Sequence, residues 1–151
     1  MQVRQILQVK DENKVLFTVA PNKTLADAIQ VMTEQDVGSV VVYDNGKMVG
    51  LLTFREVLRG IRSAGQHWQS VPVSKLMLKD PVTAGPEMQV DDMRRMMLEK
   101  HCRYLPVLDG NTLMGVVSFH DVARAILEEQ GFENRMLKSY INDSPIQETL
   151  G

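Results

Sequence analysis

The fold is decided by a stretch that runs Val40-Val41-Val42-Tyr43-Asp44-Asn45-Gly46-Lys47-Met48-Val49-Gly50-Leu51-Leu52-Thr53-Phe54-Arg55-Glu56, because its pattern recurs 65 positions later, in residues 105–121. The recurrence extends without a gap over residues 15–61 and 80–126, and 12 of the 47 aligned pairs are identical. Ordinary residue usage gives roughly three identities by chance. The chain therefore contains two copies of one unit, and we expect an internal pseudo-twofold axis that presents any cleft between the copies twice.

Each copy predicts the element order β-α-β-β-α. A short β-like piece (15–19 or 82–83) comes before a helical pattern in which apolar residues recur at helical spacing. Two apolar runs joined by turn residues, Asp44-Asn45-Gly46 in the first copy, predict a β-hairpin, and a second helix follows. The runs are apolar throughout, which indicates sheets covered by helices. We predict a mixed α+β fold.

The domain boundaries follow from the repeat. Residues 3–7 resemble residues 73–77, displaced by 70 positions, and residues 63–70 form a natural connector. We predict a first unit over 1–70 with its core at 15–61, a second over 71–128 with its core at 80–126, and a helical extension with a polar tail over 129–151. Gly131 weakens the prediction of the extension helix.

Bulk properties disfavour several classes of protein. A chain of 151 residues with 44% apolar and 24% charged residues is an ordinary globular protein that needs no metal or disulfide. The net charge of −2 disfavours nucleic acid and anionic membranes as partners. No apolar run approaches about 20 residues, and no signal-peptide pattern is present, so we expect a cytoplasmic protein. Cys102 is the single cysteine, and we interpret it as a small buried apolar residue rather than a reactive thiol.

The best candidates for chemistry are the two strand-to-helix junctions, Gly50–Glu56 and Gly115–Asp121. A glycine lets a ligand approach the backbone, and the N–H groups and hydroxyl at a helix N-terminus favour a phosphate. A carboxylate three residues after the hydroxyl is suited to the two hydroxyls of a ribose. The same pattern is also a capping box, which satisfies N–H groups at the helix start, so both interpretations stay open.

The pattern as a whole resembles a tandem pair of cystathionine-β-synthase (CBS) domains, the Bateman module. The residues that carry the resemblance are Thr18-Val19-x-Pro21, Val40-Val41-Val42-x-Asp44, Leu105-Pro106-Val107-x-Asp109 and the two Gly-x-x-Ser/Thr-x-x-acid junctions. It covers about residues 1–128. The resemblance implies two units packed sheet to sheet and clefts that bind adenosine compounds: AMP, ADP, ATP, S-adenosylmethionine or a dinucleotide such as NAD. It implies no catalytic cofactor.

The resemblance also implies a crossed assignment, in which each pocket takes one wall from each copy. One pocket would contain Lys14, Val15, Phe17, Gly38, Ser39 and Val40 with Ser118, His120 and Asp121. The other would contain Lys79, Asp80, Val82, Arg103, Tyr104 and Leu105 with Thr53, Arg55 and Glu56. Ser118 would face the phosphate and Asp121 the ribose, whereas Arg55 and Arg103 suit phosphate oxygens.

The copies depart from the family pattern in different ways. Glu56 replaces the usual Asp, Val41 stands where the second copy has Pro106, and Gly38 stands opposite Arg103. We therefore expect unequal affinities at the two pockets. A solvated surface role remains the alternative for Arg103.

The leading functional hypothesis is a regulatory module without catalysis that senses an adenine nucleotide. We expect it to act on a protein partner in trans or as a homodimer. The first alternative is an enzyme that acts on nucleotides, but the sequence contains no set of nucleophile, base and orienting residue and no Walker-type phosphate loop. The second is a structural adaptor with vestigial clefts. No metal site is expected, because His67 has no partner at metal-ligand spacing.

Overall fold

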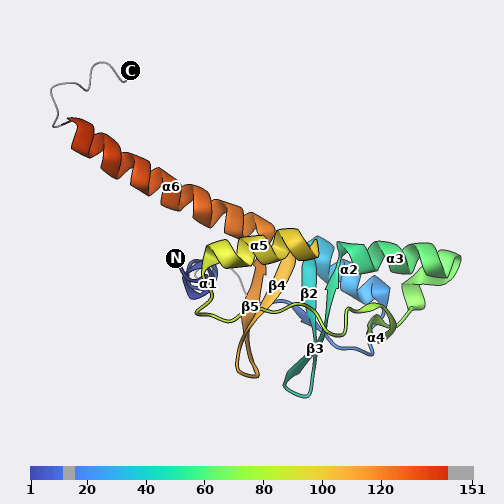
Figure 1. The fold of residues 1–151 in the computed structure, drawn as a ribbon. Helices are drawn as coiled ribbons and strands as arrows, with labels where there is room; N and C mark the ends of the chain where they lie inside the picture. Colours follow the sequence, from blue (N-terminus) through green and yellow to red (C-terminus); the bar gives the residue numbers. More distant parts are fainter. Residues whose placement is uncertain (12–15, 143–151) are drawn as a thin grey trace.

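The computed structural model describes residues 1–11 and 16–142. The first unit comprises β1 (Thr18–Val19), α2 (Leu25–Glu34), β2 (Ser39–Asp44), β3 (Lys47–Thr53) and α3 (Phe54–Ala64). The second comprises α5 (Val90–Lys100), β4 (Tyr104–Asp109), β5 (Thr112–Ser118) and α6 (Phe119–Asn142). Helix α1 (Val3–Asp11) precedes both units, and a 3-10 helix η1 (Gly65–Ser70) and helix α4 (Val73–Leu76) connect them. Figure 1 shows the units side by side.

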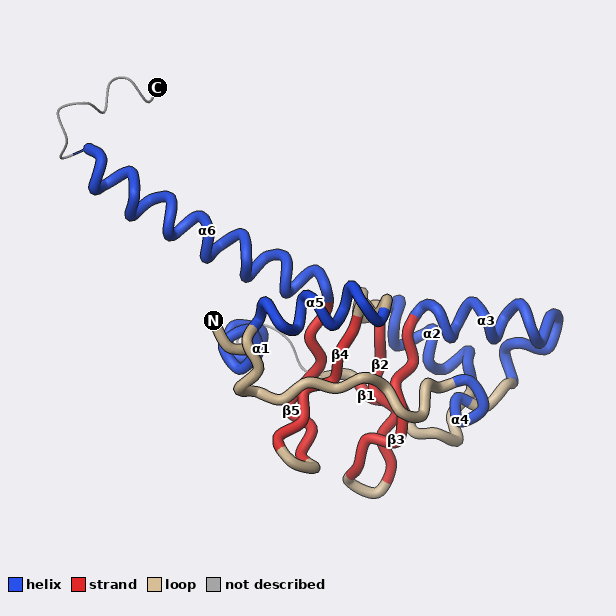
Figure 2. The backbone as a smooth tube through the Cα atoms, viewed as in Figure 1, coloured by secondary structure: helices blue, strands red, loops and turns tan. Residues whose placement is uncertain are grey.

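The two β-hairpins are superimposable in register, as the repeat requires. Strand β2 pairs antiparallel with β3, with Val42 opposite Gly50, and β4 pairs with β5 with Val107 opposite Gly115. Each hairpin has a register shift directly after that pair. Strands β3 and β5 contact each other, so the two sheets meet there. The predicted mixed α+β fold of two related units is therefore confirmed, and Figure 2 shows its strands beneath the row of α2, α3 and α5.

The opening strands of the two units differ. Strand β1 pairs in parallel with β2, and the Val41 N–H donates to the Phe17 carbonyl at 3.2 Å. Residues 82–83 form no strand among those the structure describes, and a single bridge joins Ala84 to β4. The reason is Pro106, which aligns with Val41 and has no N–H to donate. The prediction of a strand at 82–83 is therefore wrong.

Helices α1 and α4 are exchanged between the units. Helix α1 precedes the first unit but packs in the core of the second, where its Val3 N–H donates to the Met88 carbonyl at 2.9 Å. Helix α4 precedes the second unit but joins the core of the first, where the Val73 N–H donates to the Lys23 carbonyl at 2.8 Å. The predicted boundary at residue 70 stays a prediction about domains. The two cores, however, cross it, and this exchange holds the units together.

The paired glycines Gly50 and Gly115 explain how the exchanged segments fit. A Cβ at Gly50 would lie 2.6 Å from the Met77 sulfur, and one at Gly115 would lie 2.9 Å from Leu7 Cδ2. Both glycines therefore make room for a segment from the neighbouring unit. At Gly50 this overturns the sequence interpretation that the glycine admits a ligand.

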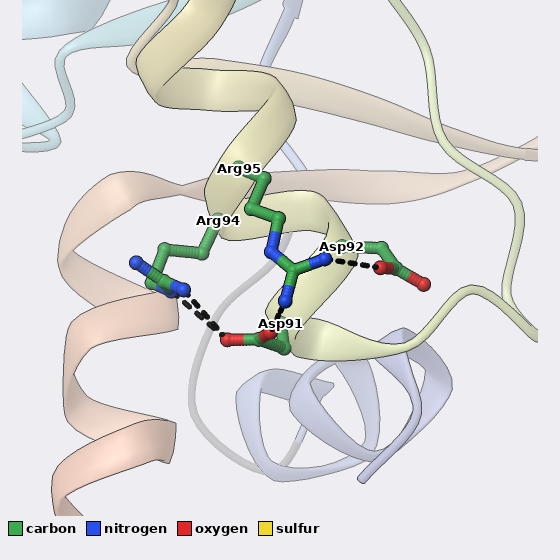
Figure 3. Close-up of polar contacts among 4 residues, drawn as sticks. All are labelled: Asp91, Asp92, Arg94 and Arg95. Atoms are coloured by element: carbon green, nitrogen blue, oxygen red, sulfur yellow. Dashed lines mark hydrogen bonds and ion pairs between the residues drawn. The ribbon is translucent and has the colours of Figure 1, made fainter.

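The first helix of each unit begins differently: α2 has a side-chain cap and α5 has none. Thr24 and Asp27 form a reciprocal capping box at the start of α2. Gln89, at the start of α5, makes no side-chain cap. The acids of that first turn pair with arginines instead, Asp91 with Arg94 at 2.9 Å and with Arg95 at 3.0 Å (Figure 3). Such exposed pairs contribute little stability individually, although the acids favour the helix N-terminus.

Helix α6 continues well past the second unit, as the sequence indicates. It runs to Asn142 and projects away from the rest of the fold (Figure 1). The polar tail predicted for the last ten residues lies outside the described residues from 143 onward. Over the described residues, no helix has both the length and the apolar character that a membrane span requires.

Candidate functional site

A cleft of about 870 Å³ lies between the two units. Its first-unit side comes from the segment before β1, the turn into β2, β2 itself and the start of α3. Its second-unit side comes from the end of α5, the starts of β4 and α6, and the end of β5. The pseudo-twofold arrangement therefore brings residues from the first strands of one unit and from the last helix of the other unit to the same cleft.

Most of the first predicted pocket is brought together in this cleft, whose lining includes Phe17, Gly38, Ser39, Ser118, His120 and Asp121. Val40 is a correction to the prediction: both Val40 and Val41 are fully buried, but Val40 belongs to the first core, while Val41 lies behind the lining of the cleft. The physical reason is strand alternation, which places Ser39 and Val41 on one face and Val40 on the other. Lys14 and Val15 lie outside the described residues.

The second predicted pocket is only partly assembled, and its assembled part shares the same cleft. Arg55, Arg103 and Tyr104 line it together with the first set. The remaining residues do not line this cleft. Leu105 is fully buried in the second core, and Val82 packs against that core. Lys79 and Asp80 are exposed, and Thr53 and Glu56 cap α3. Leu105 is corrected for the same reason as Val40, since Tyr104 takes the cleft side of β4.

Both strand-to-helix junctions form capping boxes. The Ser118 N–H donates to Asp121 Oδ2 at 2.8 Å, and the Asp121 N–H donates to Ser118 Oγ at 3.1 Å. The Thr53 N–H and hydroxyl donate to Glu56 Oε1 at 3.0 and 2.6 Å. The capping alternative is therefore present at both junctions. Ser118 and Asp121 nevertheless line the cleft, whereas Glu56 is buried and does not line it.

Tyr104 of the second unit packs against Gly38 of the first unit at the contact between the units, which is called the seam below. Its hydroxyl lies so close to Gly38 that any side chain there would collide with it. Burial raises the pKa of the Tyr104 phenol, Arg103 lowers it, and the charge of Asp121 raises it. Arg103 and Asp121 line the same cleft as Tyr104. Sequence reasoning missed this packing role, because the need for glycine at 38 arises only when the units meet.

Arg55 ties the units together across the cleft. Its guanidinium, from the first turn of α3, donates to the His101 carbonyl at the end of α5 at 2.8 Å. His101 follows α5 with a left-handed φ of 54°, and Asp36, its partner in the repeat, has a φ of 52° after α2. Both line the cleft, although the sequence analysis did not select either. Both follow the first helix of their unit, α2 or α5, and lie just before the strand that lines the cleft, so their sequence position could have identified them.

The cleft brings side chains of both charge signs together. Its lining includes the cations Arg55 and Arg103, the histidines His101 and His120, and the acids Asp36 and Asp121. The Nε2 atom of His120 lies 3.2 Å from the Arg124 guanidinium, which belongs to the next turn of α6.

Cys102 lines the cleft as well but is half-buried and packs against the second core. Burial raises the pKa of its thiol, while Arg55 and Lys100 lower it. A raised pKa leaves less thiolate, in keeping with an apolar packing role. Among the residues with described placement, no group of three or more His, Cys, Asp or Glu is arranged to hold a metal ion.

Two duplicated units with exchanged helices and one cleft between them define a tandem module. The family model of the CBS domain matches this chain twice, over residues 5–63 and 73–128. The protein therefore belongs to the CBS domain family and contains a pair of these domains, which are generally regulatory modules.

Relatives support this assignment. The chain is 34% identical over 106 residues to the CBS domain-containing protein YhcV of Bacillus subtilis, covering 70% of this chain and 75% of that protein. It matches the solved structure of a protein with CBS domains from Burkholderia ambifaria MC40-6, assigned to signal transduction, with a TM-score of 0.80 and 30% identity over 86% of this chain and 96% of the other. The CBS domain pair of protein MJ0100 shares the fold at a TM-score of 0.73 and 20% identity, over 85% of this chain and 98% of that one.

Proposed function

We propose that the cleft between the units binds an adenosine-containing nucleotide and that the chain reports its presence without catalysis. The observation that carries the proposal is the crossed lining of the cleft, in which Gly38 and Ser39 of one unit face Ser118 and Asp121 of the other. Its volume of about 870 Å³ lies within the range of roughly 300–1,000 Å³ that is usual for small-molecule sites.

The lining offers a partner for each part of such a ligand. Phe17 provides apolar surface for the base, and Asp121 provides a carboxylate for the ribose hydroxyls. Ser118 stands directly before the N-terminus of α6, where N–H groups favour a phosphate. Arg103 and Arg55 add guanidinium groups, which match phosphate oxygens in a fixed geometry.

Related structures support the ligand class. The CBS domain pair of protein MJ0100 was solved in complex with methylthioadenosine and S-adenosyl-L-methionine, both adenosine compounds. For this chain the candidates are AMP, ADP, ATP, NAD and S-adenosylmethionine. The two guanidinium groups favour the phosphate-bearing ones over S-adenosylmethionine.

The signal would be a change in how the units sit against each other. Tyr104 packs on Gly38 and Arg55 bonds to the His101 carbonyl, so both contacts join the units at the place where the ligand enters. A ligand that alters either contact shifts the relative orientation of the units. A coupling of about 1–3 kcal/mol then changes the affinity for a protein partner several-fold.

A thermal-shift screen against the five adenosine compounds tests the proposal. Binding at about a hundredfold excess over Kd stabilises the folded state by roughly 2.7 kcal/mol, which for this length raises the Tm by about 5–10 °C. Asp121→Ala should reduce the shift from ribose-containing ligands far more than Glu56→Ala does. The two variants are matched because each removes the carboxylate of a capping box. Absence of any shift at millimolar ligand, or equal loss in both variants, would contradict the assignment.

One observation favours a second candidate, a structural adaptor. The Tyr104 side chain already occupies the space over Gly38, as a vestigial cleft filled by its own residues would require. Tyr104→Ala separates the two functions. A sensor gains or keeps nucleotide affinity when this side chain is removed, whereas an adaptor binds no nucleotide in either form.

A further inference from the structure

The cleft between the units continues into a second hollow along α6. This hollow, called the α6 groove below, has a volume of about 540 Å³ and is lined only by residues of α6. His120 and Ala123 line both the cleft and the groove, so the two spaces adjoin at the first turns of the helix. The rest of the groove is lined by Arg124, Leu127, Glu128, Gly131 and Arg135.

The residues of the groove form one stripe on the solvent side of α6. His120 and Arg124 are four positions apart, and Arg124 and Gly131 are seven, which are spacings that keep residues on one face of a helix. Val122 and Ala125 lie on the opposite face and are buried in the core of the second unit. The stripe therefore starts at the cleft and follows α6 away from the fold (Figure 1).

The groove contains two guanidinium groups that form no ion pair with a described residue. Arg124 contacts His120 Nε2 at 3.2 Å. Arg135 reaches back over Gly131, where a Cβ would lie 3.8 Å from its Nη1 atom. The lining contains a single carboxylate, that of Glu128. The two guanidinium groups suit phosphate oxygens or the face of a base, and the carboxylate suits hydroxyl donors.

The groove begins where the proposed function places the phosphate. Ser118 stands directly before α6, and His120, in the first turn, borders both spaces. A phosphate chain that leaves the cleft past His120 meets Arg124 one turn further along, roughly 6 Å at 1.5 Å per residue. Beyond Arg124 lies Leu127, whose side chain is 66% exposed and offers apolar surface. The order along the groove is therefore a cation, an apolar side chain and a second cation, that of Arg135.

We propose that the α6 groove holds the second half of a dinucleotide whose adenosine half occupies the cleft, an inference that rests on the proposed function. The pyrophosphate passes His120 and meets Arg124, and the second nucleoside packs on Leu127 beneath Arg135 with its ribose beside Glu128. The cleft and the groove, at about 870 and 540 Å³, each have the volume of one small-molecule site, roughly 300–1,000 Å³. Two such volumes in contact match a ligand of two nucleoside halves, whereas AMP would leave the groove empty.

Calorimetric titration of the full chain with AMP, ADP and NADH tests the proposal, NADH being a dinucleotide whose two bases are uncharged. Wild type should bind NADH at least about threefold more tightly than AMP. Arg124→Ala should weaken NADH about three- to tenfold, as the loss of one exposed charge-assisted contact predicts, and should leave the affinity for AMP within about twofold. Arg59→Ala is the matched control, because Arg59 is the exposed repeat equivalent of Arg124 on α3 and lines neither space.

A second variant separates the nucleoside from the phosphates. Leu127→Ser should weaken NADH but not ADP, because ADP has the same two phosphates without the second nucleoside, and thermal unfolding of each variant checks that the units still fold. Binding of AMP without any preference for NADH would overturn this inference and leave the proposed function standing. Equal losses of NADH affinity in Arg124→Ala and Arg59→Ala, or equal effects of Leu127→Ser on ADP and NADH, would do the same. No binding of any of the three compounds would overturn both.

Discussion

Removing the Glu56 carboxylate should destabilise the first unit by an amount that its hydrogen bonds define. Glu56 is 8% exposed, and its Oε1 accepts from the N–H and the hydroxyl of Thr53 at 3.0 and 2.6 Å. Glu56→Ala removes a capping box worth about 1 kcal/mol. It also leaves a partly buried N–H without its acceptor, which costs about 1 kcal/mol more. The expected loss is about 2 kcal/mol, and for a chain of this length the Tm falls by about 4–8 °C.

Urea and thermal unfolding followed by circular dichroism measure this loss. Glu56→Gln is the matched control, because its amide oxygen can still accept from Thr53, and it should lose less than half as much as Glu56→Ala. The reasoning is refuted if alanine and glutamine have equal effects, or if alanine costs less than about 0.5 kcal/mol. In either case the hydrogen bonds from Thr53 would not account for the stability that Glu56 contributes.

Three further predictions concern acid, the seam and the thiol. Bonds from the backbone and side chain of Thr24 lower the pKa of Asp27, so its contribution to stability is present above the unfolded value of 3.8 and is lost as pH falls through the folded pKa. The Tm difference between wild type and Asp27→Asn should therefore shrink from pH 7 to pH 3, and a constant difference would disprove the link. Gly38→Ala should destabilise the fold by about 1–3 kcal/mol through collision with Tyr104. Tyr104→Phe should relieve part of that cost in the double variant. No cost for Gly38→Ala would show that Tyr104 does not pack on Gly38 in solution. Because burial raises the pKa of the Cys102 thiol, iodoacetamide at pH 8 should alkylate it more slowly in the native chain than in urea, and equal rates would contradict its burial.

The repeat made the element order, the hairpins and the helix caps predictable, because each depends on local sequence. Val42 pairs with Gly50 just as Val107 pairs with Gly115. These positions are aligned in the repeat, so equivalent pairing was expected. The junction hydroxyls and acids were predicted to cap their helices or to bind a ligand. The structure shows the caps and places Ser118 and Asp121 in the cleft, while the ligand role stays a prediction.

The features that sequence did not predict depend on contacts between the copies. Residues 3–7 and 73–77 resemble each other, so nothing local says that Val3 packs in the second core and Val73 in the first. The cleft face of β2 was also hidden, since Val40, Val41 and Val42 are all apolar and show no alternation. The missing strand at 82–83 is the exception, because it depends on the second copy alone: Pro106 lacks the N–H that Val41 supplies in the first unit, so it was predictable in principle.

The most direct measurement of the central claim is a nucleotide titration of the isotopically labelled chain followed by amide resonances in NMR. Gly38 and Gly115 are suitable reporters, because they lie on opposite sides of the cleft and belong to different units. We predict that both amides shift together along one saturable curve as ADP or AMP is added. Shifts confined to one unit, or none at millimolar nucleotide, would contradict a ligand site between the two CBS domains.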